Sequence, residues 1–551
     1  MTSRNLLAAL AALAAVALGA CAERDAGLQD VRAALIEQLR QPQDQDRAIA
    51  AFYARRDHEP FWTRANDNGG DAAAGPAQAL LEQLRSADTL GLPRAPYKPE
   101  SVAAQLGLRM DPTLRAQTEI ALSRVYLRYA GDVTQGHTDP ADVDGWLIPR
   151  RPFDPAQALI LLDEHGVDDA IEALEPRTDD YRRLVAARRE LVRRIQEGGW
   201  ETVQYEGVIE PGERHPVLPK IRQRLLAGGE LARDESGDDP QRYDEPTVAA
   251  VKDFQRRHGI ADDGVLGPEV QAMLNVSAEQ RLEQVDWNLE RLRWLPDPPQ
   301  SRHVAVNLAG FRLRAFDGDE VVLSMPVIVG KEQHATPAFA DQIEYLQINP
   351  YWNVPDSIIV NEIAPKIVDD PDYLRANDME VVREPAPNAE SIDPAGIDWA
   401  GYAGSGDDFP YLLRQRPGPK NALGRIKFMF PNRHAIYLHD TPAGHLFDEV
   451  QRTFSHGCIR VRDPVELADY LLDGQPDWDA ERVREAVDGG ERSRIALDDK
   501  VPVRLYYLTA WVDEDDERIS FRRDIYGHDE RLRARVDALR QRADAGTKPQ
   551  V

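Results

Sequence analysis

The sequence predicts a multidomain α+β protein whose N-terminal half is helical and whose C-terminal half is mostly β. Three observations predict this class. Apolar residues recur at helical spacing up to about residue 200, a compact unit of short helices follows, and from about residue 300 apolar and polar residues alternate with period two. A chain of 551 residues also has room for about three or four domains.

Residues 22–202 are expected to form a helical scaffold domain. One apolar stripe at helical spacing comprises Leu122, Val125, Tyr126 and Tyr129, and a second comprises Tyr181, Leu184, Val185, Leu191, Val192 and Ile195. Asp179 is placed to cap the second helix. This range shows no constellation of catalytic side chains, which favours a structural role.

A separate three-helix module is predicted over residues 203–277. Its first two helices are expected at 217–227 and 246–258, and a turn at 262–268 leads into a last short helix through Leu274. Gly264 and Gly267 allow the left-handed turns that compact helix junctions require. A connecting helix is expected over 278–300, and a generic helical linker domain is the alternative for the module.

A mostly-β domain is predicted over residues 301–510. Its strands are expected at 304–308, 311–316, 321–329, 343–348, 426–430, 435–439 and 503–507. The helical stretch at 361–416, rich in Pro, Gly and Asp, interrupts the sheet and is predicted to be a capping insertion that acts as a lid, with hinges at Gly401, Gly404 and Gly406. Residues 511–551 form a charged tail with a predicted helix from Asp529 to Ala545.

The first 21 residues are predicted to be an export signal. Arg4 provides a positive n-region, residues 6–18 are apolar and uncharged, and small residues precede Cys21. The Leu18-Gly19-Ala20-Cys21 pattern resembles a bacterial lipobox, in which Cys21 is lipidated and anchors the chain to the inner or the outer membrane. An uncleaved anchor and an ordinary signal peptide are the alternatives. All of these place the body of the protein in the cell envelope, in the periplasm.

The composition argues against a nucleic-acid partner. The chain has 67 Lys and Arg residues against 94 Asp and Glu residues, a formal net charge of −27. Contacts with phosphate backbones or anionic lipid surfaces would need clustered basic side chains. The charge suits a soluble, envelope-exposed protein whose substrate carries amines.

The segment 454–460, Phe-Ser-His-Gly-Cys-Ile-Arg, contains the candidate catalytic residue. Cys458 is one of two cysteines in the chain, so if Cys21 is lipidated Cys458 has no disulfide partner, and two cysteines are too few for a cysteine metal site. A catalytic thiol needs a base or a positive environment, and His439 and His456 are both available. Gly457 leaves backbone amides free for an oxyanion. The alternative for Cys458, a small buried hydrophobe, is disfavoured by the neighbouring histidines and glycine.

Ser455-His456-Gly457-Cys458, preceded by His439-Asp440, resembles the signature of L,D-transpeptidases with a YkuD-type catalytic domain. Phe254-Gln255, Asp263-Gly264 and Leu266-Gly267 resemble a peptidoglycan-binding module. The domain order is similar to that of the large YcbB-like subgroup. Many family members carry Asn two residues after the cysteine, where this chain has Arg460.

The resemblance implies a cysteine mechanism with no metal and no cofactor. Cys458 would attack the carbonyl between the third residue of a tetrapeptide stem, a diamino acid, and its terminal D-Ala. His439, oriented by the Asp440 carbonyl, would be the general base, and the amides of Gly457 and Cys458 would stabilise the oxyanion. Ser455 and His456 would hold the loop. Tyr437 and Arg460 would face the substrate.

The implied product is a 3→3 peptidoglycan cross-link, formed when a side-chain amine of a second stem resolves the thioester. The implied partners are peptidoglycan stem peptides, with penicillin-binding proteins as candidate protein partners, and carbapenems would acylate the thiol. The alternatives are an L,D-carboxypeptidase, an enzyme that anchors a lipoprotein to the wall, and a non-catalytic wall-binding lipoprotein. A papain-like hydrolase is disfavoured, because it would need the cysteine before the histidine in the chain.

Overall fold

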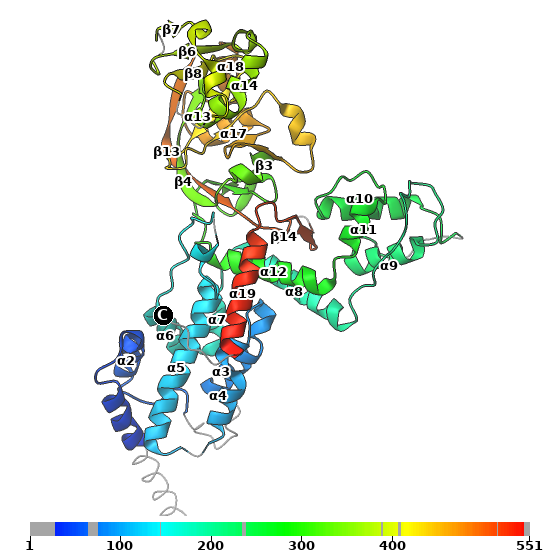
Figure 1. Cartoon of the computed structure of the whole chain (residues 1–551). Helices are drawn as coiled ribbons and strands as arrows, with labels where there is room; N and C mark the ends of the chain where they lie inside the picture. Colours follow the sequence, from blue (N-terminus) through cyan, green and yellow to red (C-terminus); the bar gives the residue numbers. More distant parts are fainter. Residues whose placement is uncertain are drawn as a thin grey trace, which may run out of the picture.

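The computed structural model describes residues 28–63, 75–108, 110–143, 145–233, 239–386, 389–405, 409–514 and 516–544. The predicted lipidation site Cys21 and the predicted hinge Gly406 lie outside these ranges. Figure 1 shows a helical body, an arm that carries α9, α10 and α11, and a sheet domain at the opposite end from the N-terminus. Among the described helices none combines the length and apolar character of a membrane span.

The helical body is built around α5 (Pro112–Gln135), whose N-cap Asp111 accepts a hydrogen bond from the Leu114 amide at 2.8 Å. The stripe predicted on this helix is buried at Leu122, Tyr126 and Tyr129. A helix at 28–38 and six named helices complete the body: α2 (Arg47–Arg55), α3 (Pro76–Arg85), α4 (Pro99–Leu106), α6 (Pro155–His165), α7 (Val167–Leu174) and α8 (Asp179–Gln196). The helical class predicted for this half of the chain is confirmed.

The N-terminus of α8 differs from the prediction. Thr178 occupies the N-cap position, and Asp179 is the first helical residue. A carboxylate in the first turn still complements the helix dipole, because the unpaired amides there are electropositive. Asp179 therefore favours the helix start from within the first turn instead of capping it.

The predicted three-helix module has its own hydrophobic core. Its helices are α9 (Leu218–Gly228), α10 (Glu245–Arg257) and α11 (Pro268–Leu274). Val251, Phe254 and Leu266 are buried in a cluster separate from the main core. Gly264 has the expected left-handed φ of 78°, whereas Gly267 is extended, with φ −99°, and forms the N-cap of α11. The next helix, α12 (Ala278–Trp294), begins with a capping box of Ser277 and Gln280.

The C-terminal half contains a nine-stranded sheet with the order β11-β3-β12-β10-β9-β4-β13-β1-β2, and β2 also pairs with β3. The strands are β1 (His303–Asn307), β2 (Arg312–Asp317), β3 (Glu320–Gly330), β4 (Phe339–Ile348), β9 (Ile426–Met429), β10 (Leu438–His439), β11 (Thr453–Ser455), β12 (Ile459–Val461) and β13 (Ser493–Tyr506). Each predicted strand is present, but the one expected at 435–439 is only Leu438–His439. Ala435 has a φ of 53°, which is incompatible with an extended chain.

The insertion predicted as a helical cap is a small α+β unit that begins before residue 361. Its sheet has the order β5-β8-β6-β7, with β5 (Trp352–Asn353), β6 (Met379–Val382), β7 (Ser391–Ile392) and β8 (Leu412–Gln415). Its helices are α13 (Asp356–Ile358), the π-helix η7 (Ile359–Ile363), α14 (Ala364–Asp369), α15 (Tyr373–Ala376) and α16 (Trp399–Tyr402). Ile359, Val381 and Leu413 are buried in a core of its own. We call residues 352–415 the capping subdomain.

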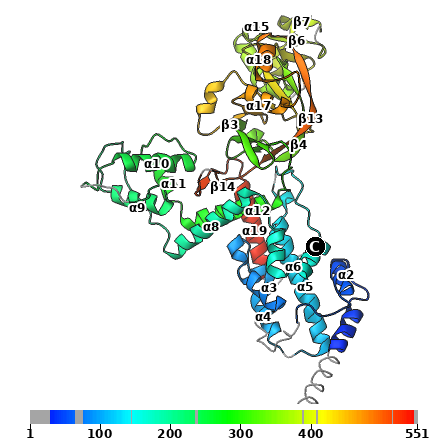
Figure 2. The same ribbon diagram turned by 180° about the vertical axis from the view of Figure 1, so that it is seen from behind.

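The end of the chain returns to the helical body. The hairpin of β14 (Ala510–Val512) and β15 (Ile519–Phe521) precedes α19 (His528–Asp544), which matches the predicted tail helix. The buried carboxylate of Asp529 pairs with Arg291 of α12 at 2.5 Å, and Leu532 is fully buried. Figure 2 shows α19 below α12, alongside the helices of the body. The charged tail is thus part of the domain interface.

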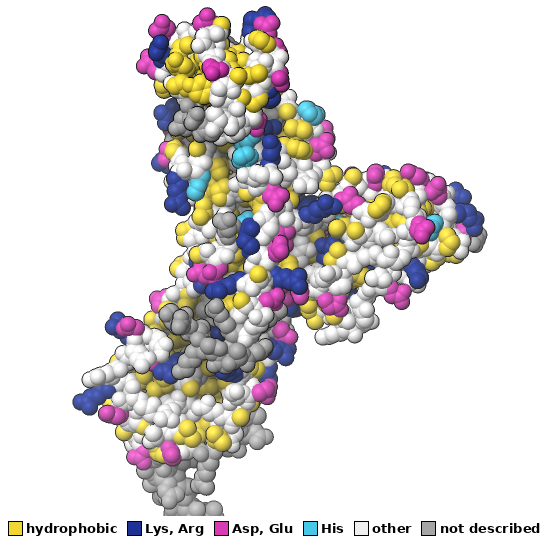
Figure 3. Space-filling view, viewed as in Figure 1, with side chains coloured by type: hydrophobic (Ala, Val, Ile, Leu, Met, Phe, Trp, Pro, Cys, Tyr) yellow, Lys and Arg dark blue, Asp and Glu magenta, His cyan; other side chains and the backbone are white. Residues whose placement is uncertain are grey.

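The remaining helices connect these elements. Two α-helices, α17 (Pro464–Leu472) and α18 (Ala480–Asp488), follow β12. The 3-10 turns are η1 (Asp44–Asp46), η3 (Ala87–Leu90), η4 (Ala95–Tyr97), η5 (Pro140–Asp142), η6 (Glu332–His334), η8 (Pro394–Gly396) and η9 (Gly444–Asp448). On the face in Figure 3, basic and acidic side chains are interspersed, without a continuous basic surface.

Candidate active site

The register of two parallel strands brings the motif residues together. In the pairing of β10 with β12, Leu438 lies opposite Ile459 and His439 lies opposite Arg460. Leu438 and Ile459 are fully buried in the core. Because side chains alternate along a strand, His439 and Arg460 lie on the other face of the sheet. Cys458 directly precedes β12 and continues that face.

His439 is buried and has a defined tautomer. Its Nδ1 lies 2.5 Å from the Asp440 carbonyl oxygen, and only 4% of the residue is exposed. A carbonyl oxygen can only accept a hydrogen bond, so Nδ1 carries the proton and Nε2 has the free lone pair. Burial, together with the positive charge of Arg460, lowers the pKa of His439 to about 3. The imidazole is therefore neutral near pH 7 and can accept a proton.

The turn before β9 holds Asp440 in place. Its side-chain oxygens accept hydrogen bonds from the amide of Arg425 at 2.7 Å and the amide of Thr441 at 2.6 Å. Gly424 has a φ of 60°, and a Cβ there would lie 2.3 Å from Asp440 Cγ. The position therefore requires glycine, both for its backbone angle and for the space that Asp440 occupies.

The cysteine loop is held by side-chain hydroxyls. The Thr336 hydroxyl donates to the Gly457 carbonyl at 2.8 Å and accepts from the Gly330 amide at 3.0 Å. The buried Ser455 hydroxyl donates to the Cys458 carbonyl and accepts from the Gly457 amide at 3.1 Å. Gly457 adopts a φ of 111°, which a residue with a side chain rarely adopts. These hydrogen bonds hold the backbone of the loop at Gly457 and Cys458.

The thiol of Cys458 is half-buried and protonated in this environment. Its Sγ lies 3.7 Å from the Ala435 carbonyl oxygen, to which it can donate. Burial raises the pKa of the thiol above its ordinary 9.0, although hydrogen bonds with Tyr437 and the charges of Lys427 and Arg460 act in the opposite direction. The resting pair is thus a neutral thiol and a neutral imidazole.

Lys427 belongs to this site, and sequence reasoning missed it. It lies on β9 opposite His439, and its Nζ is 3.6 Å above the centre of the Tyr437 ring. Burial lowers the pKa of Lys427 to about 8. The signal in the sequence was a lysine within the apolar strand 426–430, at a position whose neighbours Ile426 and Phe428 are both buried.

His456 lies on the other side of the cysteine loop and points to the capping subdomain. Its Nε2 pairs with the Glu362 carboxylate of η7. Its ring also lies 4.9 Å from the ring of His334 in η6. Of the two histidines singled out in the sequence, His439 shares a sheet face with Cys458, and His456 links the loop to the cap.

Comparison with known families covers three parts of the chain. Residues 47–187 match a family described as a scaffold domain, and residues 218–274 match one described as "Putative peptidoglycan binding domain". Residues 301–483 match the L,D-transpeptidase catalytic domain, YkuD. The sheet domain is a YkuD-type L,D-transpeptidase domain. The YkuD match includes β10, the cysteine loop and the whole capping subdomain.

Similar proteins carry the same description. A Haemophilus influenzae protein named "Putative L,D-transpeptidase" is 33% identical over 245 residues, which are 44% of this chain and 48% of the relative. The chain thus matches about half the length of this curated relative. Solved L,D-transpeptidase structures from Xylanimonas cellulosilytica and Stackebrandtia nassauensis are 15% and 13% identical, with TM-scores of 0.16 and 0.21. Each match spans 55% of this chain, with 99% and 96% of those structures covered.

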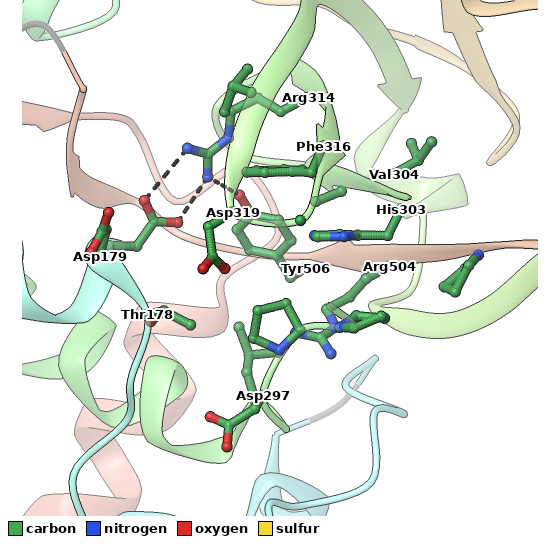
Figure 4. A pocket seen from close by; sticks show the side chains of 18 of the residues that line it. Thr178, Asp179, Asp297, His303, Val304, Arg314, Phe316, Asp319, Arg504 and Tyr506 are labelled. Carbon is green, nitrogen blue, oxygen red and sulfur yellow. Dashed lines mark hydrogen bonds and ion pairs between the residues drawn. The ribbon is translucent and has the colours of Figure 1, made fainter. Parts of the chain in front are cut away.

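A separate cavity of about 1230 Å³ lies where the YkuD domain meets the helical body, and Figure 4 shows its lining. Arg314 donates to Asp180 and to the Tyr506 hydroxyl there, and His303 stacks on Phe316 with ring centres 4.6 Å apart. These charged groups have partners within the interface. Neither Cys458 nor His439 lines the cavity, which we interpret as a domain junction.

No group of three His, Cys, Asp or Glu side chains in the described ranges is placed to hold a metal ion. The groups gathered at the candidate site are the Cys458 thiol, the His439 imidazole and the cationic side chains of Lys427 and Arg460.

Proposed function

We propose that this chain is an L,D-transpeptidase that forms 3→3 peptidoglycan cross-links through a thioester on Cys458. The observation that carries the proposal is the strand register, which places His439 two residues beyond the position opposite Cys458, and therefore on the same face of the YkuD domain. A nucleophile and a neutral base on one rigid sheet face are the minimum that acyl transfer by a thiol requires.

The first step acylates the enzyme. Cys458 Sγ attacks the carbonyl carbon between the third stem residue and the terminal D-Ala, and Nε2 of His439 takes the thiol proton as the C–S bond forms. The tetrahedral adduct collapses, the C–N bond to D-Ala breaks, and the imidazolium returns the proton to the leaving amine. The products are a thioester and free D-Ala.

The second step forms the cross-link. The side-chain amine of a diamino acid in a neighbouring stem attacks the thioester carbon and loses a proton to His439. The C–S bond then breaks, a new amide bond remains, and the thiolate recovers the proton from the imidazolium. His439 has a pKa of about 3. Its imidazolium form is therefore stable only while the negative charge of the tetrahedral adduct or of the thiolate lies beside it.

The oxyanion would be stabilised by the amides of Gly457 and Cys458. Each such donor contributes about 3 kcal/mol in other oxyanion holes. In the structure the Gly457 amide donates to Ser455 Oγ. It would have to exchange this acceptor for the oxyanion, and the Ser455 hydroxyl would keep its bond to the Cys458 carbonyl.

The other domains fit a wall-bound enzyme. The module of α9, α10 and α11 would hold peptidoglycan near the active site, and the capping subdomain would form a lid over Tyr437 and Arg460 on the substrate side. The domain order supports placement in the YcbB-like subgroup. We further propose a periplasmic location, a lipid anchor on Cys21, penicillin-binding proteins as partners, and acylation of Cys458 by carbapenems.

Incubating the protein with disaccharide-tetrapeptides and identifying the products by mass spectrometry tests the proposal. Cross-linked dimers with release of D-Ala are expected. Disaccharide-tripeptides alone would show that water resolves the thioester, as in an L,D-carboxypeptidase. An acyl acceptor that is a lipoprotein lysine would show an anchoring enzyme. Absence of turnover and of any Cys458 adduct would leave only a wall-binding protein.

A further inference from the structure

Two cations flank the candidate catalytic pair in a single row. His439 lies opposite Lys427 in the antiparallel pairing of β9 with β10, and opposite Arg460 in the parallel pairing of β10 with β12. Directly paired residues of neighbouring strands lie on the same face of a sheet. Lys427, His439 and Arg460 therefore form one row, and Cys458 lies two residues before Arg460, on the same face.

These two cations lack the partners that cations elsewhere in the domain have. Arg462 pairs with Asp448 at 3.5 Å, and Lys500 pairs with Glu344 at 2.5 Å. Among the described residues no carboxylate lies within ion-pair distance of Lys427 or Arg460, and the buried Nε of Arg460 has no hydrogen-bond partner. Partly buried charges in proteins are normally paired.

The electrostatics indicate an uncompensated positive site. Burial lowers the pKa of Lys427 to about 8 and lowers the pKa of Arg460 as well. The ring of Tyr437, 3.6 Å from Lys427 Nζ, replaces part of the lost hydration. A ring face stabilises a cation less than a carboxylate does, so an anion that enters the site would be attracted by both charges.

We propose that Lys427 and Arg460 form a carboxylate-binding subsite for the acyl donor. The inference rests on the proposed function and names the group of the substrate that the site binds. In the donor, the carboxylate of the departing terminal residue is separated from the scissile amide nitrogen by a single carbon. A cation beside the attacking thiol is therefore within reach of that carboxylate.

A donor stem has a second carboxylate when its third residue is diaminopimelate, because this diamino acid carries one on its side chain. Both groups present the same chemistry to Lys427 and Arg460, and the substrates chosen below distinguish them. The acceptor is an amine and is cationic before it reacts. The two positive charges would repel it from this subsite, so they would favour binding of the donor there.

The first experiment measures acylation of the full-length protein with four tetrapeptide donors. The terminal residue carries either a carboxylate or an amide, and the third residue is either diaminopimelate or lysine. We expect Lys427→Met and Arg460→Met each to lower the preference for one carboxylate about tenfold, through KM more than kcat. If the preference between the terminal carboxylate and the terminal amide falls, the subsite binds the terminal carboxylate. If the preference between diaminopimelate and lysine falls, it binds the side-chain carboxylate. Unchanged preferences in both variants, with the fold intact, would overturn the proposal.

The second experiment does not depend on turnover. Cys458 is alkylated at pH 7 with anionic iodoacetate or neutral iodoacetamide, and the adduct is quantified by peptide mass spectrometry. The iodoacetate to iodoacetamide rate ratio should fall several-fold in Lys427→Met and in Arg460→Met, because the reagents differ mainly in charge. Arg462→Met and Lys500→Met, which remove paired cations of the same domain, should leave the ratio unchanged.

The two experiments separate the failure of each idea. If the wild type accepts no donor, the proposed function fails, and a lower alkylation ratio in the two variants still supports the anion subsite. If donors are accepted and the ratio stays constant across all variants, the subsite is wrong and the proposed function stands. Thermal unfolding of each variant shows whether it is folded, and methionine is chosen because its unbranched side chain fills the space of the lysine stem.

Discussion

The imidazole of His456 pairs through Nε2 with the carboxylate of Glu362, a residue 94 positions earlier in the chain. Glu362 belongs to the π-helix of the capping subdomain, and His456 belongs to the loop that presents Cys458. Short π-helical turns within helices occur frequently at functional sites. The pair is thus a direct link between the capping subdomain and the loop of the candidate nucleophile.

Replacing Glu362 with Gln should impair function more than stability. Both side chains are partly exposed, 37% for Glu362 and 26% for His456, so the contact between them contributes at most about 1 kcal/mol to folding. We expect an unfolding temperature close to that of the wild type and a several-fold higher KM for the donor, because the cap is held less firmly. Asp372→Asn, which alters an exposed pair on the same subdomain, is the control. Identical KM values in the two variants would contradict a link with functional consequences.

His439→Gln should reduce turnover about 10²-fold to 10⁴-fold with the fold retained, because this residue is proposed as the proton acceptor. Acylation by the donor and by a carbapenem would be followed by intact-mass spectrometry. His456→Gln is the comparison, and its loss should be smaller because its ring contacts Glu362 and His334. A larger loss in His456→Gln than in His439→Gln would reverse the assignment of the base.

The alkylation of Cys458 by iodoacetamide should increase with pH through the neutral range without a plateau. Burial disfavours the thiolate and raises the pKa of the thiol above its ordinary value of 9.0. The reactive thiolate fraction should therefore grow about tenfold per pH unit between pH 7 and pH 9. In Lys427→Met the curve should move to still higher pH, because a cation that stabilises the thiolate is lost. A rate that is already constant below pH 7 would indicate a preformed thiolate–imidazolium pair instead.

Gly424→Ala should destabilise the domain and displace His439. The substitution forces a side chain into a left-handed backbone at φ 60°, which costs about 1–2 kcal/mol, and the new Cβ would collide with Asp440. Lower thermal stability and lower acylation rates are expected together. Gly444→Ala is the matched control, since a Cβ there meets nothing within 4 Å. Equal effects of the two substitutions would show that the turn tolerates a side chain.

Tyr526→Phe should destabilise the loop that carries Cys458 through an intermediate residue, Gly330. The Tyr526 hydroxyl donates to the Gly330 carbonyl at 2.7 Å. The Gly330 amide donates to the Thr336 hydroxyl, which in turn donates to the Gly457 carbonyl. Leaving a buried carbonyl without a donor costs about 1–3 kcal/mol of folding free energy. Denaturant unfolding would measure this loss. Tyr345→Phe is the control, because its ring contacts Arg494 at 3.8 Å without using the hydroxyl.

The local sequence pattern was sufficient to predict those helices and strands whose formation depends mainly on the residues within them. The stripe at Leu122, Tyr126 and Tyr129 is buried as expected, because burial of one face follows from helical spacing. The period-two segments after residue 300 are strands. The failures were also local: Ala435 leaves the extended conformation at φ 53°, and Gly267 caps α11 in an extended conformation. At Ala435 the backbone turns around Asn432, whose Oδ1 accepts hydrogen bonds from the amides of His434 and Ile436.

The sequence by itself determined which residues are candidates for the chemistry: Cys458, the single thiol after residue 21, with histidines at 439 and 456 and a glycine beside it. Only the tertiary structure decided which histidine shares its sheet face and that Lys427 and Arg460 lie in the same row. It also showed that the capping subdomain has a sheet of its own and that Glu362 contacts His456. The physical reason is that strand register and ion pairs between distant segments depend on how the whole core packs, whereas alternation and motif spacing are properties of neighbouring residues.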